Sequence, residues 1–194
     1  MNHPEKLWVE WAKIFIIALA LTVFVRTFLF APIVVDGSSM LPTLHDRDKM
    51  IVNKFDYHFK DPERFDIIVF HASEDRDFIK RIIGLPGEHV EVRNRVLYID
   101  GEKVPEPFLA ENDERNMDSD VTIYENFTLE ELPGGYQTIP EDKYLVLGDN
   151  RNNSTDSRVI GLISKSQIVG KTDIIIWPIS RWQTLNSNDN EVNI

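Results

Sequence analysis

Hydrophobic residues are concentrated in one long run near the N-terminus. Residues 14–30 read IFIIALALTVFVRTFLF and contain a single charge, Arg26. At a rise of about 1.5 Å per residue, a helix of this run measures roughly 25 Å, and its apolar flanks extend it to the thickness of a bilayer core. Trp8 and Trp11 suit the headgroup region, and Arg26 lies close enough to the far end to reach the interface. The pattern predicts a tail and membrane anchor over residues 1–31.

Two other interpretations of this segment compete with the anchor: a cleavable secretory signal and a core helix. No cleavage site of the small-x-small type follows the run, where Ala31 precedes Pro32. A core helix would leave unexplained why the segment is apolar on every face. Two lysines ahead of the run favour a cytoplasmic N-terminus and an external domain, although two glutamates and Arg26 weaken this signal.

After Pro32 the pattern changes to short apolar runs separated by turn residues. Many runs are rich in β-branched or aromatic residues, and Asn94-Arg95 and Asp100-Gly101 lie between runs, where hairpin turns belong. Neither a second long helical period nor an internal repeat is present. We expect one mostly β domain over residues 32–194. Its predicted strands are 33–35, 50–53, 65–70, 78–83, 89–93, 96–99, 144–147 and 168–177.

Two stretches depart from this pattern. Residues 105–140 are acidic, punctuated by proline and glycine, and poor in periodicity except for a short strand predicted at 121–124. We interpret them as an insertion rather than a second domain. Residues 186–194 are polar and are expected to fray.

Composition removes several classes of function. The 194 residues are 42% hydrophobic, enough for a packed core. The absence of cysteine excludes a disulfide framework, thiolate metal sites and a cysteine nucleophile. A net charge of −11 argues against nucleic-acid binding, which needs a basic stripe. The five histidines show no metal-ligand spacing, so we expect no metal site, and neither a P-loop nor a dinucleotide fingerprint occurs.

Three segments could carry chemistry. In residues 36–44 a glycine and two serines follow a strand end, which can present a hydroxyl beside free backbone N–H groups, as an acyl-transfer nucleophile requires. In residues 78–87, strand alternation places Phe78 and Lys80 on one face, where burial would lower the pKa of Lys80 and suit it to act as a general base. Residues 148–158 can form a dense hydrogen-bonded loop. Taken singly, each segment is more typical of plain structure. Residues 36–44 and 148–158 would be ordinary loops, and Lys80 and Arg81 would be surface cations packed along a sheet edge.

Four ordered boxes resemble those of bacterial type I signal peptidases. They are SMLPTL at 39–44, RFDIIVF at 64–70, FIKRIIGLPG at 78–87 and GDNRNNSTDSR at 148–158. With the predicted anchor, the resemblance extends from about residue 7 to residue 180 and is greatest to the single-anchor Gram-positive branch. It implies a cofactor-free β domain of strongly bent antiparallel sheets. It further implies a membrane-bound endopeptidase that cleaves signal peptides from exported preproteins after small residues at positions −1 and −3.

The resemblance also implies roles for individual residues. Ser39 corresponds to the nucleophile, Lys80 to the general base, and Ser154 to the serine that hydrogen-bonds and orients the lysine. Support through ion pairs and hydrogen bonds is expected from Asp149, Arg151, Asp156 and Arg158. Apolar groups are expected around the lysine, namely Phe70, Phe78 and Val146. The substrate pocket is expected to include Phe70 and Phe78 as well as Ile33, Val35, Met40, Leu44 and Ile79.

Two positions depart from the family pattern. Gly37 stands where many relatives outside the Gram-positive branch carry a serine whose hydroxyl helps to bind the oxyanion, so the second oxyanion donor is unidentified. Phe65 stands where glycine is usual. The alternatives are a catalytically silent membrane-anchored binding module, a self-cleaving regulator, and a Ser-His-Asp hydrolase that uses His45. For the leading hypothesis we expect a single-pass protein of the cell membrane, with preproteins as substrates and residues 31–35 resting on the lipid.

Overall fold

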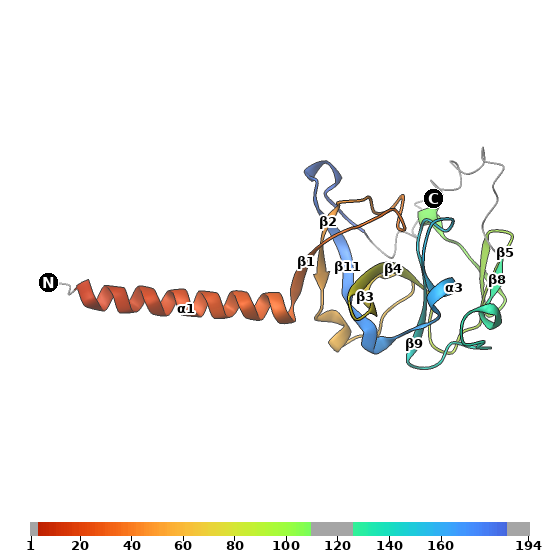
Figure 1. Ribbon diagram of the computed structural model, residues 1–194, viewed down its shortest axis with the longest axis horizontal. Helices are drawn as coiled ribbons and strands as arrows, with labels where there is room; N and C mark the ends of the chain where they lie inside the picture. The colour runs from red at the N-terminus through yellow and green to blue at the C-terminus, as the bar shows by residue number, and fades with distance from the viewer. Residues whose placement is uncertain (1–3, 110–125, 186–194) are drawn as a thin grey trace, which may run out of the picture.

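The N-terminal apolar segment forms a long helix that stands away from the rest of the chain. The structure is a computed structural model that describes residues 4–109 and 126–185. Helix α1 (Pro4–Phe28) leads into strand β1 without packing on the domain (Figure 1). Its stretch Trp8–Phe28 is long and apolar enough to cross a bilayer, and none of it is buried inside the protein. The core-helix interpretation is therefore wrong, because this helix has no core to enter.

Most of the described strands belong to one antiparallel sheet, with the order β1-β2-β11-β3-β4-β9-β10 and with β12 paired to β11. Register shifts interrupt the pairing of β11 with β2 and β3, and of β4 with β3 and β9. Such bulges bend strands and increase their twist. The strands are β1 (Phe30–Val34), β2 (Lys49–Asn53), β3 (Ile67–Ser73), β4 (Arg76–Gly84), β9 (Lys143–Leu147), β10 (Ile163–Ser164), β11 (Ile168–Trp177) and β12 (Gln183–Thr184).

A smaller antiparallel sheet with the order β7-β6-β5-β8 lies at the end of the domain far from α1 (Figure 1). Its strands are β5 (Val90–Arg93), β6 (Val96–Ile99), β7 (Glu102–Val104) and β8 (Phe127–Thr128). The two predicted hairpin turns are confirmed, since Asn94-Arg95 and Asp100-Gly101 join these strands with positive φ angles. The short helices are α3 (Ser157–Ile160), η1 (Asp56–His58), η2 (Pro107–Leu109), η3 (Leu129–Glu131), η4 (Lys165–Gln167) and η5 (Ile179–Arg181).

The prediction of a mostly β, antiparallel fold is confirmed, and each of the eight main predicted strands corresponds to an observed one. The sequence pattern missed β7, β8, β10 and β12, because strands of two or three residues are too short to show alternation. The strand predicted at 121–124 and the tail 186–194 lie outside the described residues. The described parts of 105–140 pack against the smaller sheet through β8 and through buried Leu129, Leu132 and Ile139.

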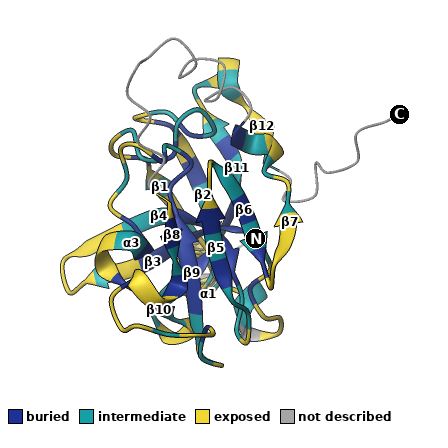
Figure 2. Cartoon of the chain, turned by 90° about the vertical axis from the view of Figure 1, so that its right-hand side faces the viewer, coloured by how far each residue is buried: buried dark blue, intermediate teal, exposed yellow. Residues whose placement is uncertain are grey.

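Buried apolar side chains form three clusters along the strands. Figure 2 shows buried residues, in dark blue, along the strands. One joins the smaller sheet to β4 and β9. A second lies beneath the loop between β1 and β2, and it includes Met40 and Leu44 of that loop with Met50, Ile67 and Ile175. The third surrounds Phe70, Ile82 and Val146. The second and third clusters support the two strands and the loop that carry the candidate site.

Candidate active site

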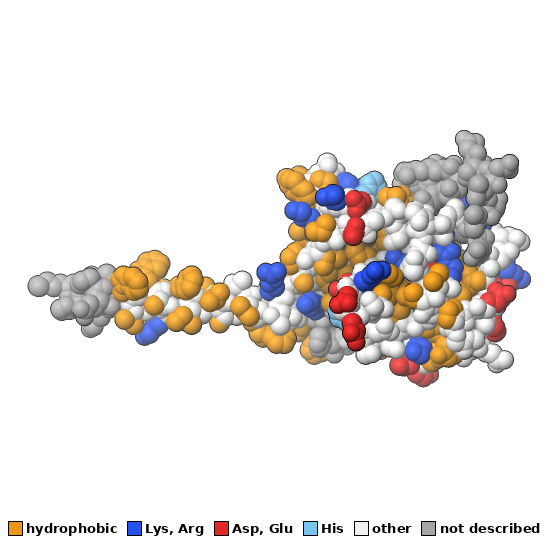
Figure 3. Space-filling model, viewed as in Figure 1, with side chains coloured by type: hydrophobic (Ala, Val, Ile, Leu, Met, Phe, Trp, Pro, Cys, Tyr) orange, Lys and Arg blue, Asp and Glu red, His pale blue; other side chains and the backbone are white. Residues whose placement is uncertain are grey.

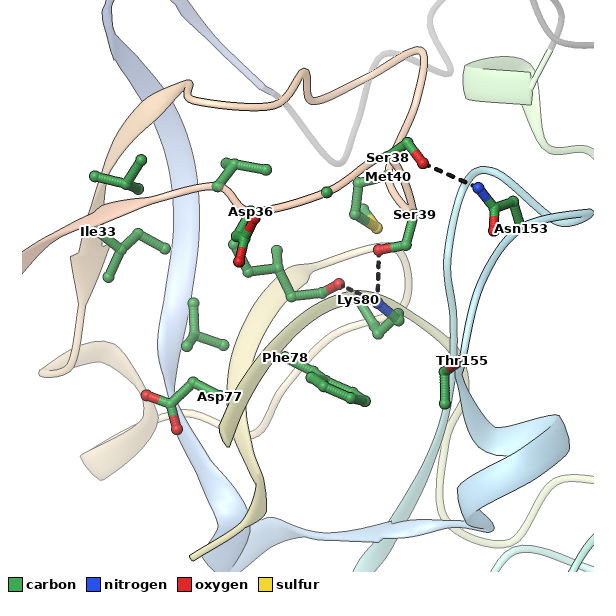
Figure 4. A pocket seen from close by; sticks show the side chains of 15 residues that line it. Ile33, Asp36, Ser38, Ser39, Met40, Asp77, Phe78, Lys80, Asn153 and Thr155 are labelled. Atoms are coloured by element: carbon green, nitrogen blue, oxygen red, sulfur yellow. Dashed lines mark hydrogen bonds between the residues drawn. The ribbon is translucent and has the colours of Figure 1, made fainter. Parts of the chain in front are cut away.

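Ser39 and Lys80 meet although they come from different parts of the sheet. Ser39 lies in the loop between β1 and β2, and Lys80 lies in the middle of β4. The distance from Lys80 Nζ to Ser39 Oγ is 2.8 Å, and Nζ also donates to the carbonyl oxygen of Ile79 at 2.9 Å. Figure 4 shows the two side chains pointing toward each other across the cleft. A hydroxyl and an amine at this distance can exchange a proton directly.

Lys80 is held in surroundings that disfavour its charge. The residue is 4% exposed, and Nζ lies 5.2 Å from the centroid of the Phe78 ring. Burial lowers the pKa of Lys80 to about 8, although the carboxylates of Asp156 and Asp149 act in the opposite direction. A lysine with this pKa has a useful neutral fraction near neutral pH, which a general base requires.

The loop that carries Ser39 is fastened to the polar loop after β9. The N–H of Asn150 donates to the carbonyl oxygen of Ser39, and its side-chain amide donates to the carbonyl oxygen of Ser38, both at 3.0 Å. The amide of Asn153 donates to Ser38 Oγ at 3.0 Å (Figure 4). Gly148 packs so closely that a Cβ there would lie 2.5 Å from the Ser39 carbonyl oxygen. Sequence reasoning missed both asparagines, although the fourth box contains them.

Two carboxylates of this loop, those of Asp149 and Asp156, form buried ion pairs with arginines. Asp149 is fully buried and holds the Arg81 guanidinium in two contacts, Nε–Oδ1 at 2.9 Å and Nη2–Oδ2 at 2.6 Å. The hydroxyl of Thr43, in the loop between β1 and β2 that carries Ser39 (the nucleophile loop), donates to the same carboxylate at 2.6 Å. The surface interpretation of Arg81 is therefore wrong, because this side chain is buried and paired.

Asp156 and Arg158 form the second arrangement. The Asp156 carboxylate accepts from Arg158 Nε and Nη2 at 2.8 Å and from the Gly148 N–H at 3.0 Å. Burial alone would raise the pKa of Asp156, but the Arg158 guanidinium and the Gly148 N–H together lower it. The group therefore stays ionised and holds the turn at Gly148 in place.

Arg151 is 5% exposed and its Nε donates to the carbonyl oxygen of Gly148 at 3.0 Å. Its guanidinium also forms an ion pair with the carboxylate of Glu106, a residue that no sequence motif includes.

Ser154 differs from the expectation. Its hydroxyl is buried with no hydrogen-bond partner among the described residues, although it lies close enough to Asp156 to help lower the pKa of that carboxyl. The lysine contact expected of Ser154 is instead made by the carbonyl oxygen of Ile79.

A cleft of about 550 Å³ opens beside the serine and the lysine. The structure places most of the expected pocket residues on its walls, namely Ile33, Val35, Met40, Phe78 and Ile79. Leu44 and Phe70 do not line it: both are fully buried in the clusters beneath, where their side chains are out of reach of a bound molecule. Phe70 and Val146 instead support the Phe78 ring from below.

The two departures from the family pattern have clear backbone reasons. Gly37 has φ +94°, a conformation that disfavours any residue with a side chain, and its N–H donates to Asp46 Oδ1 at 2.9 Å. The Gly37 N–H is thus occupied and does not supply an oxyanion donor. Phe65 has a positive φ (70°), a conformation that glycine adopts readily, and burial of its ring in the core holds it there.

Two other kinds of site were considered among the described residues, a triad that uses His45 and a metal site. No hydrogen bond links His45 to Ser39 there, and His45 does not line the cleft. No group of three or more metal-binding side chains was found among them.

Comparisons with known proteins agree with this geometry. The family model described as signal peptidase, peptidase S26, matches residues 8–177. A signal peptidase I of Bacillus amyloliquefaciens is 45% identical over 88% of this chain and 89% of its own length. Signal peptidase I S of Bacillus subtilis (strain 168) is 42% identical over 94% of this chain and 96% of its own. A crystal structure of a signal peptidase I from Enterococcus faecalis V583 is 43% identical, with a TM-score of 0.53, covering 58% of this chain and 97% of that one.

Proposed function

Because the chain belongs to the signal peptidase family, peptidase S26, and is a serine endopeptidase that cleaves signal peptides, we propose that Ser39 and Lys80 form its catalytic dyad. The observation that carries this proposal is the 2.8 Å separation of Ser39 Oγ from a buried lysine nitrogen. The pKa of about 8 for Lys80 adds the protonation state that the chemistry needs. Its substrates are preproteins that bear signal peptides.

The dyad accounts for both halves of the reaction. Neutral Lys80 accepts the Ser39 proton as Oγ bonds to the scissile carbonyl carbon, and the Ser39 N–H donates to the developing oxyanion. When the C–N bond breaks, Lys80 passes the proton to the leaving amine. Lys80 then takes a proton from water, whose oxygen attacks the acyl-enzyme and releases Ser39. Ser154 makes no hydrogen bond to the lysine in this structure; its proposed role is to orient Lys80 during the cycle from its buried position beside Asp156.

The cleft supports cleavage after small residues at positions −1 and −3. It lies between β1 and β4, so an extended substrate can pair with strand backbone while alternate side chains enter shallow pockets. The apolar walls at Ile33, Val35, Met40 and Ile79 leave room for small side chains. Substituting larger residues at position −1 or −3 of a preprotein should reduce cleavage, whereas changes at −2 should have little effect.

We propose that α1 anchors the enzyme in the cell membrane, with the N-terminus in the cytoplasm and the β domain outside. Hydrophobic side chains gather on α1 and on the end of the domain nearest to it (Figure 3). Exposed apolar residues follow β1 and the adjoining end of β11, namely Phe30, Val34, Trp177, Ile179 and Trp182. The chain as a whole has a net charge of −11 and should be repelled by anionic lipid, so these apolar groups are the proposed lipid contact.

Cleavage of a preprotein in detergent or lipid vesicles tests the dyad. Ser39→Ala and Lys80→Ala should abolish cleavage, while Ser38→Ala and His45→Ala should retain it. Activity that survives either of the first two changes would refute the dyad, and loss with His45→Ala would favour a triad. A folded wild-type enzyme that cleaves no preprotein would favour a silent binding module.

Orientation is tested separately on intact cells. Protease added outside should digest the domain that follows residue 31. Protection of the domain would reverse the proposed orientation.

A further inference from the structure

A short segment outside every motif contacts the arginines that support the site. Residues 106–108 lie between β7 and the end of η2. The Glu106 carboxylate meets the Arg151 guanidinium in two contacts, Nη2–Oε1 at 2.5 Å and Nη1–Oε2 at 3.3 Å. The two side chains are only 7% and 3% exposed. Pro105 and Pro107 flank Glu106 and restrict its backbone. Little conformational entropy is therefore lost when the Glu106 carboxylate pairs with Arg151.

The next contact of this segment is made by Phe108. The guanidinium carbon of Arg81 lies 4.0 Å from the centroid of the Phe108 ring, which in turn packs edge-on against Phe65. Arg81 follows Lys80 directly in β4 and is tied to Asp149. The segment therefore touches two arginines: Arg151 of the polar loop, and Arg81, which is paired with Asp149 of the same loop.

Arg151 is linked to Ser39 through its neighbour in sequence, Asn150. Arg151 Nε donates to the carbonyl oxygen of Gly148, and the preceding residue, Asn150, holds the carbonyl oxygens of Ser38 and Ser39. A guanidinium that is fixed at both ends keeps this turn in a single position. If one end is released, the turn can relax, and Ser39 moves with it because Asn150 binds its backbone.

We propose that Glu106 is a positioning residue for the catalytic pair, acting through Arg151, and that Phe108 makes the parallel contact through Arg81. This inference rests on the proposed dyad of Ser39 and Lys80. Glu106 does not reach the cleft, so its effect must be on the placement of the reacting atoms rather than on substrate binding. It also gives a catalytic role to the start of the region that the sequence marks only as an acidic insertion.

The first test replaces the carboxylate by its amide. Glu106→Gln keeps the size of the side chain but removes its charge. It should lower kcat by at least about tenfold, since small misplacements of reacting groups have effects of this size or larger. KM for a preprotein should stay within about twofold, because the binding surface is unchanged.

A matched control separates positioning from general destabilisation. Glu88 forms another two-contact pair, with Arg64. The pair is partly buried, and its other hydrogen bonds are to the backbone of Ile83 and Leu85. Glu88→Gln should lower the melting temperature while leaving kcat unchanged at a temperature where the protein is folded. If Glu88→Gln reduces kcat as much as Glu106→Gln does, the positioning role is refuted.

A double-mutant cycle tests the route through Arg151. On an Arg151→Met background, adding Glu106→Gln should change kcat by less than about twofold, because the group that Glu106 holds is already absent. The melting temperature of this double variant should exceed that of Glu106→Gln alone, since the double variant no longer buries the Arg151 charge without the Glu106 carboxylate. Equal kcat losses from Glu106→Gln with and without Arg151 would overturn the proposed route.

The same assay distinguishes failure of this inference from failure of the dyad. Ser39→Ala and Lys80→Ala are measured alongside. If they retain activity, the dyad itself is refuted. If they abolish activity while Glu106→Gln keeps wild-type kcat, the dyad stands and the positioning role of Glu106 falls.

Discussion

Burial of Lys80 should make the enzyme less stable at neutral pH than a variant that lacks this charge. The pKa of Lys80 is about 8 in the folded protein, against 10.5 for an ordinary lysine. These values differ by about 2.5, which at about 1.4 kcal/mol for each pKa unit amounts to about 3 kcal/mol. We expect Lys80→Met, of similar length and apolar, to be inactive and to escape this penalty.

The sign of the effect depends on pH. Below about pH 8 the lysine is protonated in both states, and the folded protein bears the whole penalty. Between about pH 8 and 10.5 the unfolded chain binds a proton that the folded protein has released, so wild-type stability rises with pH. The advantage of Lys80→Met in free energy of unfolding should therefore be greatest below pH 8. It should then shrink by about 1.4 kcal/mol for each pH unit above.

Urea denaturation of both proteins in one detergent, from pH 6 to 9.5, measures this difference. Losing the contacts of Nζ with Ser39 and Ile79 lowers the stability of the variant by a similar amount at every pH, so the slope is the decisive quantity. Lys143→Met, a partly exposed lysine on β9, is the control for removal of a lysine. A difference that is constant with pH, or that grows above pH 8, would refute the reasoning.

Three further outcomes are expected. In the proposed dyad only neutral Lys80 accepts the Ser39 proton, so kcat/KM should fall about tenfold for each pH unit below about 8; a flat profile from pH 6 to 8 would contradict this. Gly148→Ala should abolish turnover in a protein that remains folded by circular dichroism, because the new Cβ would lie 2.5 Å from the Ser39 carbonyl oxygen. Asp149→Asn should lower the free energy of unfolding in urea by about 3–5 kcal/mol, because it leaves Arg81 buried without its counter-charge. An unchanged denaturation midpoint would show that this pair is not needed for stability.

The local pattern of the chain was sufficient to predict its elements and its family. An apolar run of helical length, and short runs of β-branched and aromatic residues, predict helix α1 and the main strands, because these preferences depend on neighbours in sequence. Four boxes in a fixed order were specific enough to indicate the family, which the comparisons confirm. Strand alternation also predicted that Lys80 lies among apolar groups, as its burial beside Phe78 bears out.

Only the tertiary structure decided which side chains meet. Ser39 and Lys80 are 41 residues apart, Ser38 and Asn150 are 112 apart, and Glu106 and Arg151 are 45 apart. No local pattern encodes such pairings, because they depend on how two bent sheets and their loops pack together. For the same reason the sequence could not reveal that Arg81 is buried rather than exposed, or that Ile79 rather than Ser154 contacts the lysine. The residue types in the boxes set the available chemistry, and packing selected the partners because burial penalises every polar group left unpaired.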